Sequence, residues 1–143
     1  PHDTVIYIYS SQTWSGNCTG NVSIDPHNLR YTTIILIVYN DTNYFIGEVR
    51  KSNSQYLYGE GTFWMNLQYF NSTASIRGID TCVNFSDTIV FNYSLILNKG
   101  WNRIFAQIAK LREYYYELSY SIFEPGGGNW FFMQHYDKDL LKN

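Results

Sequence analysis

The stretch that decides the fold runs from Thr88 to Ile122 and reads TIVFNYSLILNKGWNRIFAQIAKLREYYYELSYSI. Its first part alternates, so that one face collects five apolar side chains, those of Ile89, Phe91, Tyr93, Leu95 and Leu97. Its last part alternates in the same way through Tyr114, Tyr116, Leu118, Tyr120 and Ile122. Alternation with a period of two is typical of a strand with one buried face. The segment therefore predicts strands, with a turn at residues 98–100.

Residues 103–117 within this stretch allow two interpretations. They contain no Gly, Pro, Asn or Asp, and apolar residues recur at the spacing of a helix face: Ile104, Ile108, Leu111, Tyr115 and Leu118. A helix over 103–117 is therefore one prediction. We favour a long hairpin, because three consecutive tyrosines and the period-two continuation after them are typical of strands.

The rest of the chain has the same character. Runs of β-branched and aromatic residues at 4–10, 31–39, 44–49, 55–58, 62–70, 76–83 and 130–135 are separated by turn residues, and Gly78 interrupts one of them. With the strands of the central stretch, this makes about nine short strands. We predict an all-β fold, an immunoglobulin-like β-sandwich of two sheets, in which residues 1–143 form a single domain.

Composition bounds the function. The chain has 143 residues, a mass of 16.8 kDa, a net charge of −2 and only 15% charged residues. Nucleic-acid binding requires clustered Lys and Arg, which are scattered here, so we expect no nucleic-acid partner. The longest apolar run, Ile34 to Tyr39, is far shorter than the roughly 20 residues of a transmembrane helix. Because the chain begins with Pro1, we expect that a leader was removed or that the chain was trimmed.

Six Asn-x-Ser/Thr triplets fall within the first 94 residues, at Asn17, Asn21, Asn40, Asn71, Asn84 and Asn92. About two would be expected by chance from this composition. Such a triplet accepts an N-linked glycan at the surface of a protein in a secretory or exoplasmic compartment. We therefore expect covalent N-glycans and an extracellular or cell-surface location. The alternative is that a chain rich in Asn, Ser and Thr forms these triplets by accident.

Cys18 and Cys82 are the two cysteines of the chain, and each lies beside sequons. In an exported protein such a pair is expected to form a disulfide. Closing a loop of this length would stabilise the fold by about 4 kcal/mol in the chain-entropy model. Two free buried thiols in a cytosolic protein are the alternative.

Catalytic, cofactor and metal motifs are not found in the sequence. It has no Gly-x-Ser-x-Gly, His-Glu-x-x-His, phosphate loop or Cys-x-x-Cys motif. His2, His27 and His135 are far apart in sequence and show no metal-ligand spacing. Glu48 and Glu60 could face each other as an acid and base for glycoside chemistry, but solvated strand carboxylates are common. We expect no enzyme, no cofactor and no metal site.

The four tryptophans bear on carbohydrate binding, because sugars stack their C–H faces on exposed aromatic rings. Trp64, Trp101 and Trp130 lie inside strand patterns, and we expect them to be buried. Trp14 lies in a polar stretch and is the best candidate for an exposed ring.

The N-terminal strand is apolar on both faces. Its residues are Thr4, Val5, Ile6, Tyr7, Ile8, Tyr9 and Ser10. A terminal strand at an open sheet edge would alternate, so this pattern predicts a strand that is covered on both faces. The polar residues that follow could act as a linker, and residues 1–17 would then be a donor strand plus linker that completes the sheet of another copy. The alternative is an ordinary first strand tucked between the sheets of its own subunit.

This combination is similar to the subunits of archaeal surface threads and related pili, which are built by donor-strand complementation. The resemblance rests on the apolar first strand, the Tyr-, Asn-, Ser-, Thr- and Ile-rich body, the dense sequons and one disulfide, and it extends over the whole chain. It implies a glycosylated extracellular filament in which residues 4–10 complete the sheet of the next copy.

We therefore expect a structural subunit of a surface filament or assembly, with other copies of the same chain as its partners. The alternative is a monomeric secreted binding module. Such a module would bind carbohydrate, or it would be a viral or parasite glycoprotein that binds a host protein with its glycan-free C-terminal third.

Overall fold

The computed structural model describes residues 6–9, 17–26, 29–39, 45–56, 58–84 and 86–134. Eleven strands join there in one hydrogen-bonded sheet, and no helix occurs in these ranges, which confirms the all-β class. The strands are β1 (Ile6–Tyr9), β2 (Asn17–Gly20), β3 (Ser23–Asp25), β4 (Tyr31–Tyr39), β5 (Phe45–Ser52), β6 (Phe63–Phe70), β7 (Ala74–Asn84), β8 (Asp87–Leu97), β9 (Gly100–Arg112), β10 (Tyr115–Ser121) and β11 (Asn129–Gln134).

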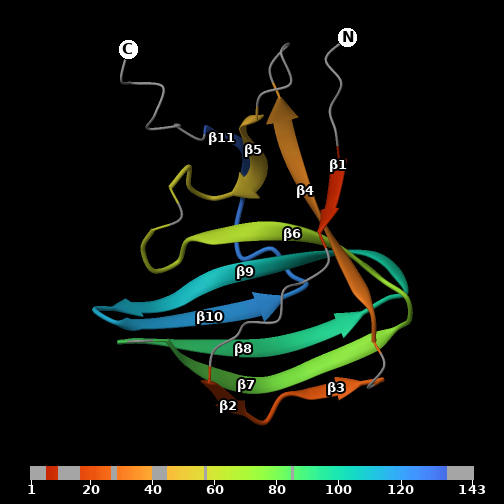
Figure 1. The fold of residues 1–143 in the computed structure, drawn as a ribbon, viewed down its shortest axis with the longest axis vertical. Coiled ribbons are helices and arrows are strands. Elements are labelled where there is room, and N and C mark those ends of the chain that lie inside the picture. The colour runs from red at the N-terminus through yellow and green to blue at the C-terminus, as the bar shows by residue number, and fades with distance from the viewer. Residues whose placement is uncertain are drawn as a thin grey trace.

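The central layer of the molecule consists of β6, β9, β10, β8 and β7, which lie side by side in that order (Figure 1). β2 and β3, two short strands that we did not predict, pair with β7. β8 and β9 are consecutive in sequence, yet β10 lies between them and runs parallel to β8. β10, the second arm of the β9–β10 hairpin, is thus inserted between β8 and β9.

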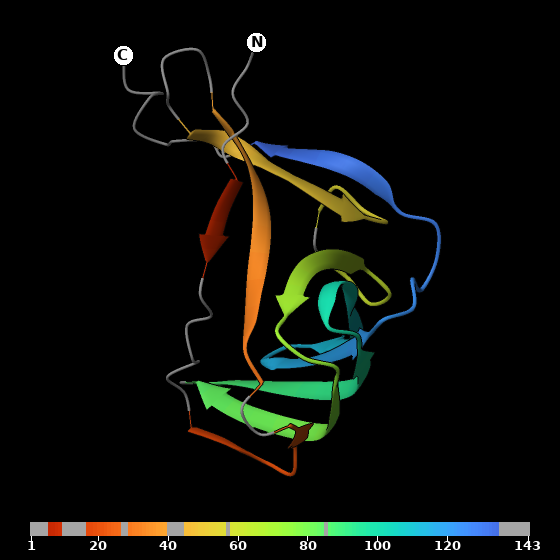
Figure 2. The same cartoon turned by 90° about the vertical axis from the view of Figure 1, so that its right-hand side faces the viewer.

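β4 links this layer to the rest of the sheet. Residues 31–34 pair with β6, whereas residues 36–39 pair with β5, which in turn pairs with β11. Figure 2 shows β4 running from the layer with β7 and β8 up to the layer with β5 and β11. The predicted two-sheet sandwich is not confirmed, because β4 joins both groups of strands in one continuous sheet.

The central strand β9 resolves the helix-or-hairpin ambiguity in favour of the hairpin. β9 pairs with β6 on one side and with β10 on the other. Ile104, Phe105 and Ala106 are all buried although they are consecutive, so both faces of the strand are covered. A strand buried on both faces loses its alternation, which is why its apolar spacing imitated a helix.

The main core cluster lies on one face of the central layer. It consists of Phe70, Ala74, Leu95, Leu97 and Ile104, with Tyr93 and Tyr120 packed against it. β8 supplies it through the predicted alternation, because Leu95 and Leu97 are buried whereas Ile96 is exposed.

Two local predictions need correction. Residues 55–58 were expected to form a strand, but residues 55 and 56 lie in a bend. There the Ser52 hydroxyl accepts a hydrogen bond from Ser54 N–H, and the Ser54 hydroxyl accepts one from Tyr56 N–H. Such local bonds compete with strand pairing. Gly78 does not interrupt its strand, because β7 continues without a break from Ala74 to Asn84.

Candidate functional site

The predicted donor strand forms an edge ladder with its own chain. Ile6, Tyr7, Ile8 and Tyr9 make up β1, which is antiparallel to β4 and lies opposite residues 33–36. Thr4, Val5 and Ser10 lie outside the described residues. Because β5 and β6 also pair with β4 at overlapping positions, β1 must occupy the opposite edge of β4. β1 lies at an end of the strand order and has no second partner among the described strands, a position that the sequence pattern does not predict. Cover over both faces of β1 stays a prediction.

A disulfide fixes the chain soon after β1. Cys18 in β2 and Cys82 in β7 are directly opposite each other in the antiparallel ladder and are disulfide-bonded. Their Cα atoms are 4.0 Å apart. The predicted disulfide is therefore present in the structure. Residues 10–16 connect β1 to this fixed point and, when extended, a segment of that length spans up to about 24 Å.

The sequons gather on and around β7, β8 and β2. Asn21 and Asn71 are exposed and Asn92 is half-buried. Asn17 and Asn84 belong to β2 and β7, and Asn40 lies outside the described residues. The hydroxyl residues of the other five sequons, Thr19, Ser23, Thr73, Ser86 and Ser94, are all exposed. The sequons seen in the structure are thus open to solvent at the hydroxyl that a glycosyltransferase requires.

Two sequon asparagines are held through their side-chain oxygens. Asn71 Oδ1 accepts a hydrogen bond of 2.9 Å from Arg30 N–H, and Asn21 Oδ1 accepts one of 3.2 Å from Ile79 N–H. A glycan is attached to Nδ2, so neither hydrogen bond uses the atom that would carry the sugar.

A group of potential metal ligands in the described part of the chain consists of Cys18, Asp80 and Cys82. Both cysteines belong to the disulfide, and a disulfide sulfur lacks the thiolate charge that binds metals. His2, His27 and His135 lie outside the described residues.

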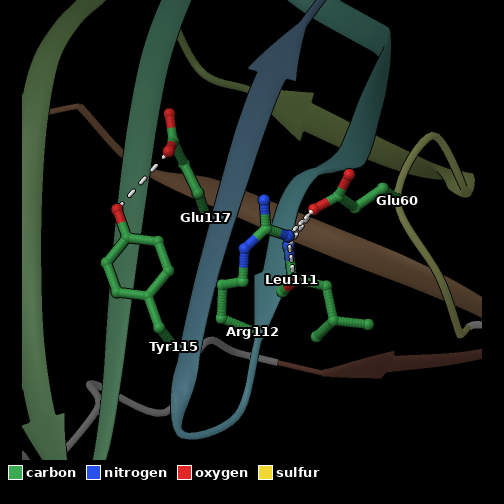
Figure 3. A network of polar contacts seen from close by, with 5 residues as sticks. All are labelled: Glu60, Leu111, Arg112, Tyr115 and Glu117. Atoms are coloured by element: carbon green, nitrogen blue, oxygen red, sulfur yellow. Dashed lines mark hydrogen bonds and ion pairs between the residues drawn. The ribbon is translucent and has the colours of Figure 1, made fainter.

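The carboxylates Glu60 and Glu124 form surface ion pairs. Glu60 accepts a 3.0 Å hydrogen bond from Leu111 N–H and a 2.5 Å bond from Arg112, joining the β5–β6 loop to the end of β9 (Figure 3). The Leu111 N–H and then Arg112 lower the pKa of Glu60. The pKa of Glu124 is lowered mainly by its 2.7 Å bond from Lys51. Both groups therefore stay charged at neutral pH, which suits an ion pair better than a proton donor.

Glu48 and Glu60, considered above as an acid and base, contact different arginines. Glu48 is paired with Arg50 on the same strand, and Glu60 with Arg112. The Tyr115 hydroxyl donates a hydrogen bond of 3.4 Å to Glu117, and Figure 3 shows the two side chains directed at each other. The Glu60–Arg112 pair joins a loop to a strand end, whereas the Glu48–Arg50 and Tyr115–Glu117 contacts each lie within one strand.

The tryptophans differ from the prediction. Trp101 is 52% exposed and Trp130 is 56% exposed, whereas Trp64 is partly buried; Trp14 lies outside the described residues. The alternation at the start of β9 could have predicted this exposure. Trp101 is two residues from the exposed Arg103, so both lie on one face, whereas the buried Ile104 lies on the other. Trp101 therefore lies on the outer face, opposite Tyr69 of β6.

Comparison of the chain with protein-family models, curated proteins and solved structures finds no match. Within the described ranges, no helix has the length and apolar character needed to cross a membrane.

Proposed function

We propose that this protein is an extracellular, N-glycosylated structural subunit whose copies are joined by exchange of β1. In this arrangement β1 of one copy leaves its own β4 and pairs with β4 of the next copy. The observation that carries the proposal is the position of β1 as an edge strand, opposite Thr33 to Leu36.

Exchange costs little free energy because it replaces one ladder with an identical one. The same residues meet in the same register, so the main-chain hydrogen bonds are equivalent in the closed and exchanged forms. The rest of the sheet is unaffected, since β4 keeps β5 and β6 on its other edge. If each copy donates to the next and the ring does not close, the product is a filament.

The linker and the disulfide provide the mechanical joint. Pulling on β1 transmits force through residues 10–16 to Cys18, which is cross-linked to Cys82 in the central layer. The disulfide prevents β2 from separating from β7 when the linker pulls on Cys18. Disulfides persist in oxidising compartments, and this supports an extracellular location, as do the sequons with exposed hydroxyls.

A pair of cysteines placed across β1 and β4 tests the exchange. Ile8 and Ile34 are directly opposite each other, so Ile8→Cys with Ile34→Cys would form a disulfide between them after oxidation. Exchanged subunits give a ladder of covalent multimers on non-reducing gels, and each band collapses to monomer on reduction. A cross-linked monomer alone, in material purified under native conditions, would refute the proposal.

Val49→Cys with Phe132→Cys is the matched control, because this pair joins β5 and β11, strands outside the proposed exchange. The control pair should give intramolecular cross-links only. Size-exclusion chromatography and negative-stain microscopy of the uncross-linked protein should show filaments or higher oligomers.

The exposure of Trp130 favours a second candidate, a carbohydrate-binding module. Trp130 borders a groove of about 130 Å³ where β4, β5 and β6 diverge, and the groove also contacts Lys51 and Asn66. Enclosed ligand pockets usually measure about 300–1,000 Å³, so a sugar would bind here by stacking on the ring at the surface. Binding on a glycan array should be lost in Trp130→Ala and kept in Phe123→Ala, which removes another exposed aromatic ring.

A further inference from the structure

The outer face of the central layer carries an exposed aromatic pair next to one of the sequons. Tyr69 and Trp101 are opposite each other in the β6–β9 ladder, with ring centroids 5.3 Å apart and planes at 70°. Tyr69 is 39% exposed and Trp101 is 52% exposed. An edge-to-face pair with this much open ring surface can bind the C–H face of a sugar.

Asn71 lies two residues after Tyr69 in the chain. β6 ends at the buried Phe70, and Asn71 is exposed in the bend that follows it. A glycan on Asn71 would therefore start close to the exposed aromatic pair. Arg30 fixes Asn71 by two main-chain contacts, donating to Oδ1 at 2.9 Å and accepting from Asn71 N–H at 3.1 Å.

An aromatic residue two positions before the asparagine occurs only in this sequon. The residues two positions before the other sequon asparagines are Ser15, Thr19, Val38, Cys82 and Val90, none of which is aromatic. Asn71 is thus the one asparagine among the six that has an aromatic side chain at this position, and that side chain is itself paired with a tryptophan.

We propose that the first sugar of an N-glycan on Asn71 packs against Tyr69 and Trp101, so that this pair binds the protein's own glycan. Attachment forms a bond between Nδ2 and the anomeric carbon of a pyrophosphate-activated sugar. Nδ2 loses one proton, and the pyrophosphate carrier departs from the sugar in a step performed by a glycosyltransferase. The packed sugar shields the aromatic rings from water and ties the end of β6 to the start of β9.

This inference rests on the glycoprotein part of the proposed function and is independent of strand exchange. The test is a double-mutant cycle on protein secreted from a glycosylating cell line, with the occupancy of each sequon measured by peptide mass spectrometry. Thr73→Ala removes the glycan and leaves Asn71 and its hydrogen bond to Arg30 in place. Trp101→Ala removes the larger ring of the pair.

We expect Thr73→Ala to lower the urea midpoint when Trp101 is present, and to lower it by less than half as much in the Trp101→Ala background. Thr73→Ser keeps the sequon and should behave as the parent protein, and Tyr69→Phe keeps the ring and should preserve the coupling. Ser94→Ala, which removes the sequon of Asn92, is the control whose effect should not depend on Trp101.

Three outcomes would overturn the inference. If Asn71 is occupied and the two Thr73→Ala shifts are equal, the glycan does not contact the pair. If the other sequons are occupied and Asn71 is empty, the inference fails while the proposed glycoprotein stands. If no sequon is occupied, both fail together.

Discussion

Tyr93 and Tyr120 stack across β8 and β10, with ring centroids 5.1 Å apart and planes at 21°. They are directly opposite each other in the parallel ladder and pack against the main core cluster. The stack lies where β10 is inserted between β8 and β9, so it joins the hairpin to the strand beside it. Burial raises the pKa of Tyr93 to about 12 and also raises the pKa of Tyr120.

These raised pKa values predict a loss of stability in alkali. Below pH 10 both hydroxyls are neutral in the folded and unfolded chains, so the stack contributes fully. Above the unfolded value of about 10, the unfolded chain releases these protons first, and the free energy of unfolding falls as pH rises through about 12. Urea unfolding between pH 8 and 12 measures this fall. Tyr93→Phe should make it shallower, whereas Tyr58→Phe, at an 84% exposed ring, should not.

Truncating two neighbouring residues of β8, one buried and one exposed, should lower the free energy of unfolding by different amounts. Leu97 has no exposed surface, whereas Ile96 is 58% exposed on the other face. Leu97→Ala should lower the free energy of unfolding by about 2–5 kcal/mol, because it leaves a cavity in the main cluster. Ile96→Ala should change it by no more than about 1 kcal/mol. Denaturant unfolding checks both, and equal losses would contradict the assignment of the buried face.

Gly78 allows a close approach of the chain between β2 and β3 to β7. A Cβ at this position would lie 2.6 Å from Asn21 O, and its φ of 126° is one that L side chains rarely adopt. Gly78→Ala should therefore cost about 2 kcal/mol or more. Gly61→Ala is the matched control, since φ there is 83° with nothing within 4 Å, and it should cost about 1 kcal/mol. Thermal unfolding of the two variants gives the comparison.

The disulfide predicts a large loss of stability on removal. Cys18 and Cys82 are separated by 64 positions, and a cross-link over a loop of this size stabilises by about 4 kcal/mol in the chain-entropy model. The variant with Cys18→Ser and Cys82→Ser should lose roughly that amount in urea unfolding. Parent protein treated with reductant should lose about as much, and a stability unchanged by reduction would contradict the prediction.

Much of the strand pattern was predictable because alternation is a property of each segment. The alternation correctly predicts the buried Phe91, Leu95 and Leu97 of β8, although Ile89 and Tyr93 on the same face are only partly buried. The three tyrosines at 114–116 correctly favour a hairpin over a helix. The cysteine pair was also predictable, since the chain offers one pairing only.

The candidate sites were less predictable. The prediction that Trp101 is buried is wrong: an aromatic ring inside a strand pattern usually indicates core, but Trp101 alternates in phase with Arg103 and is exposed with it. The edge position of β1 is not predictable from its sequence, because apolar residues on both faces of a strand are typical of an inner strand. Neither the type of the side chains nor the spacing of apolar residues determines which strands pair with each other.

By itself the sequence determined the all-β class, the location of most strands, the disulfide partners and the six sequons, because these depend on residues close in the chain or on residue identity alone. The tertiary structure alone decided that β10 lies between β8 and β9, that β4 joins all strands in one sheet and that Tyr69 meets Trp101 beside Asn71. The physical reason is that strand pairing uses main-chain hydrogen bonds, which are the same for nearly every residue, so the order of strands follows from the packing of the whole chain.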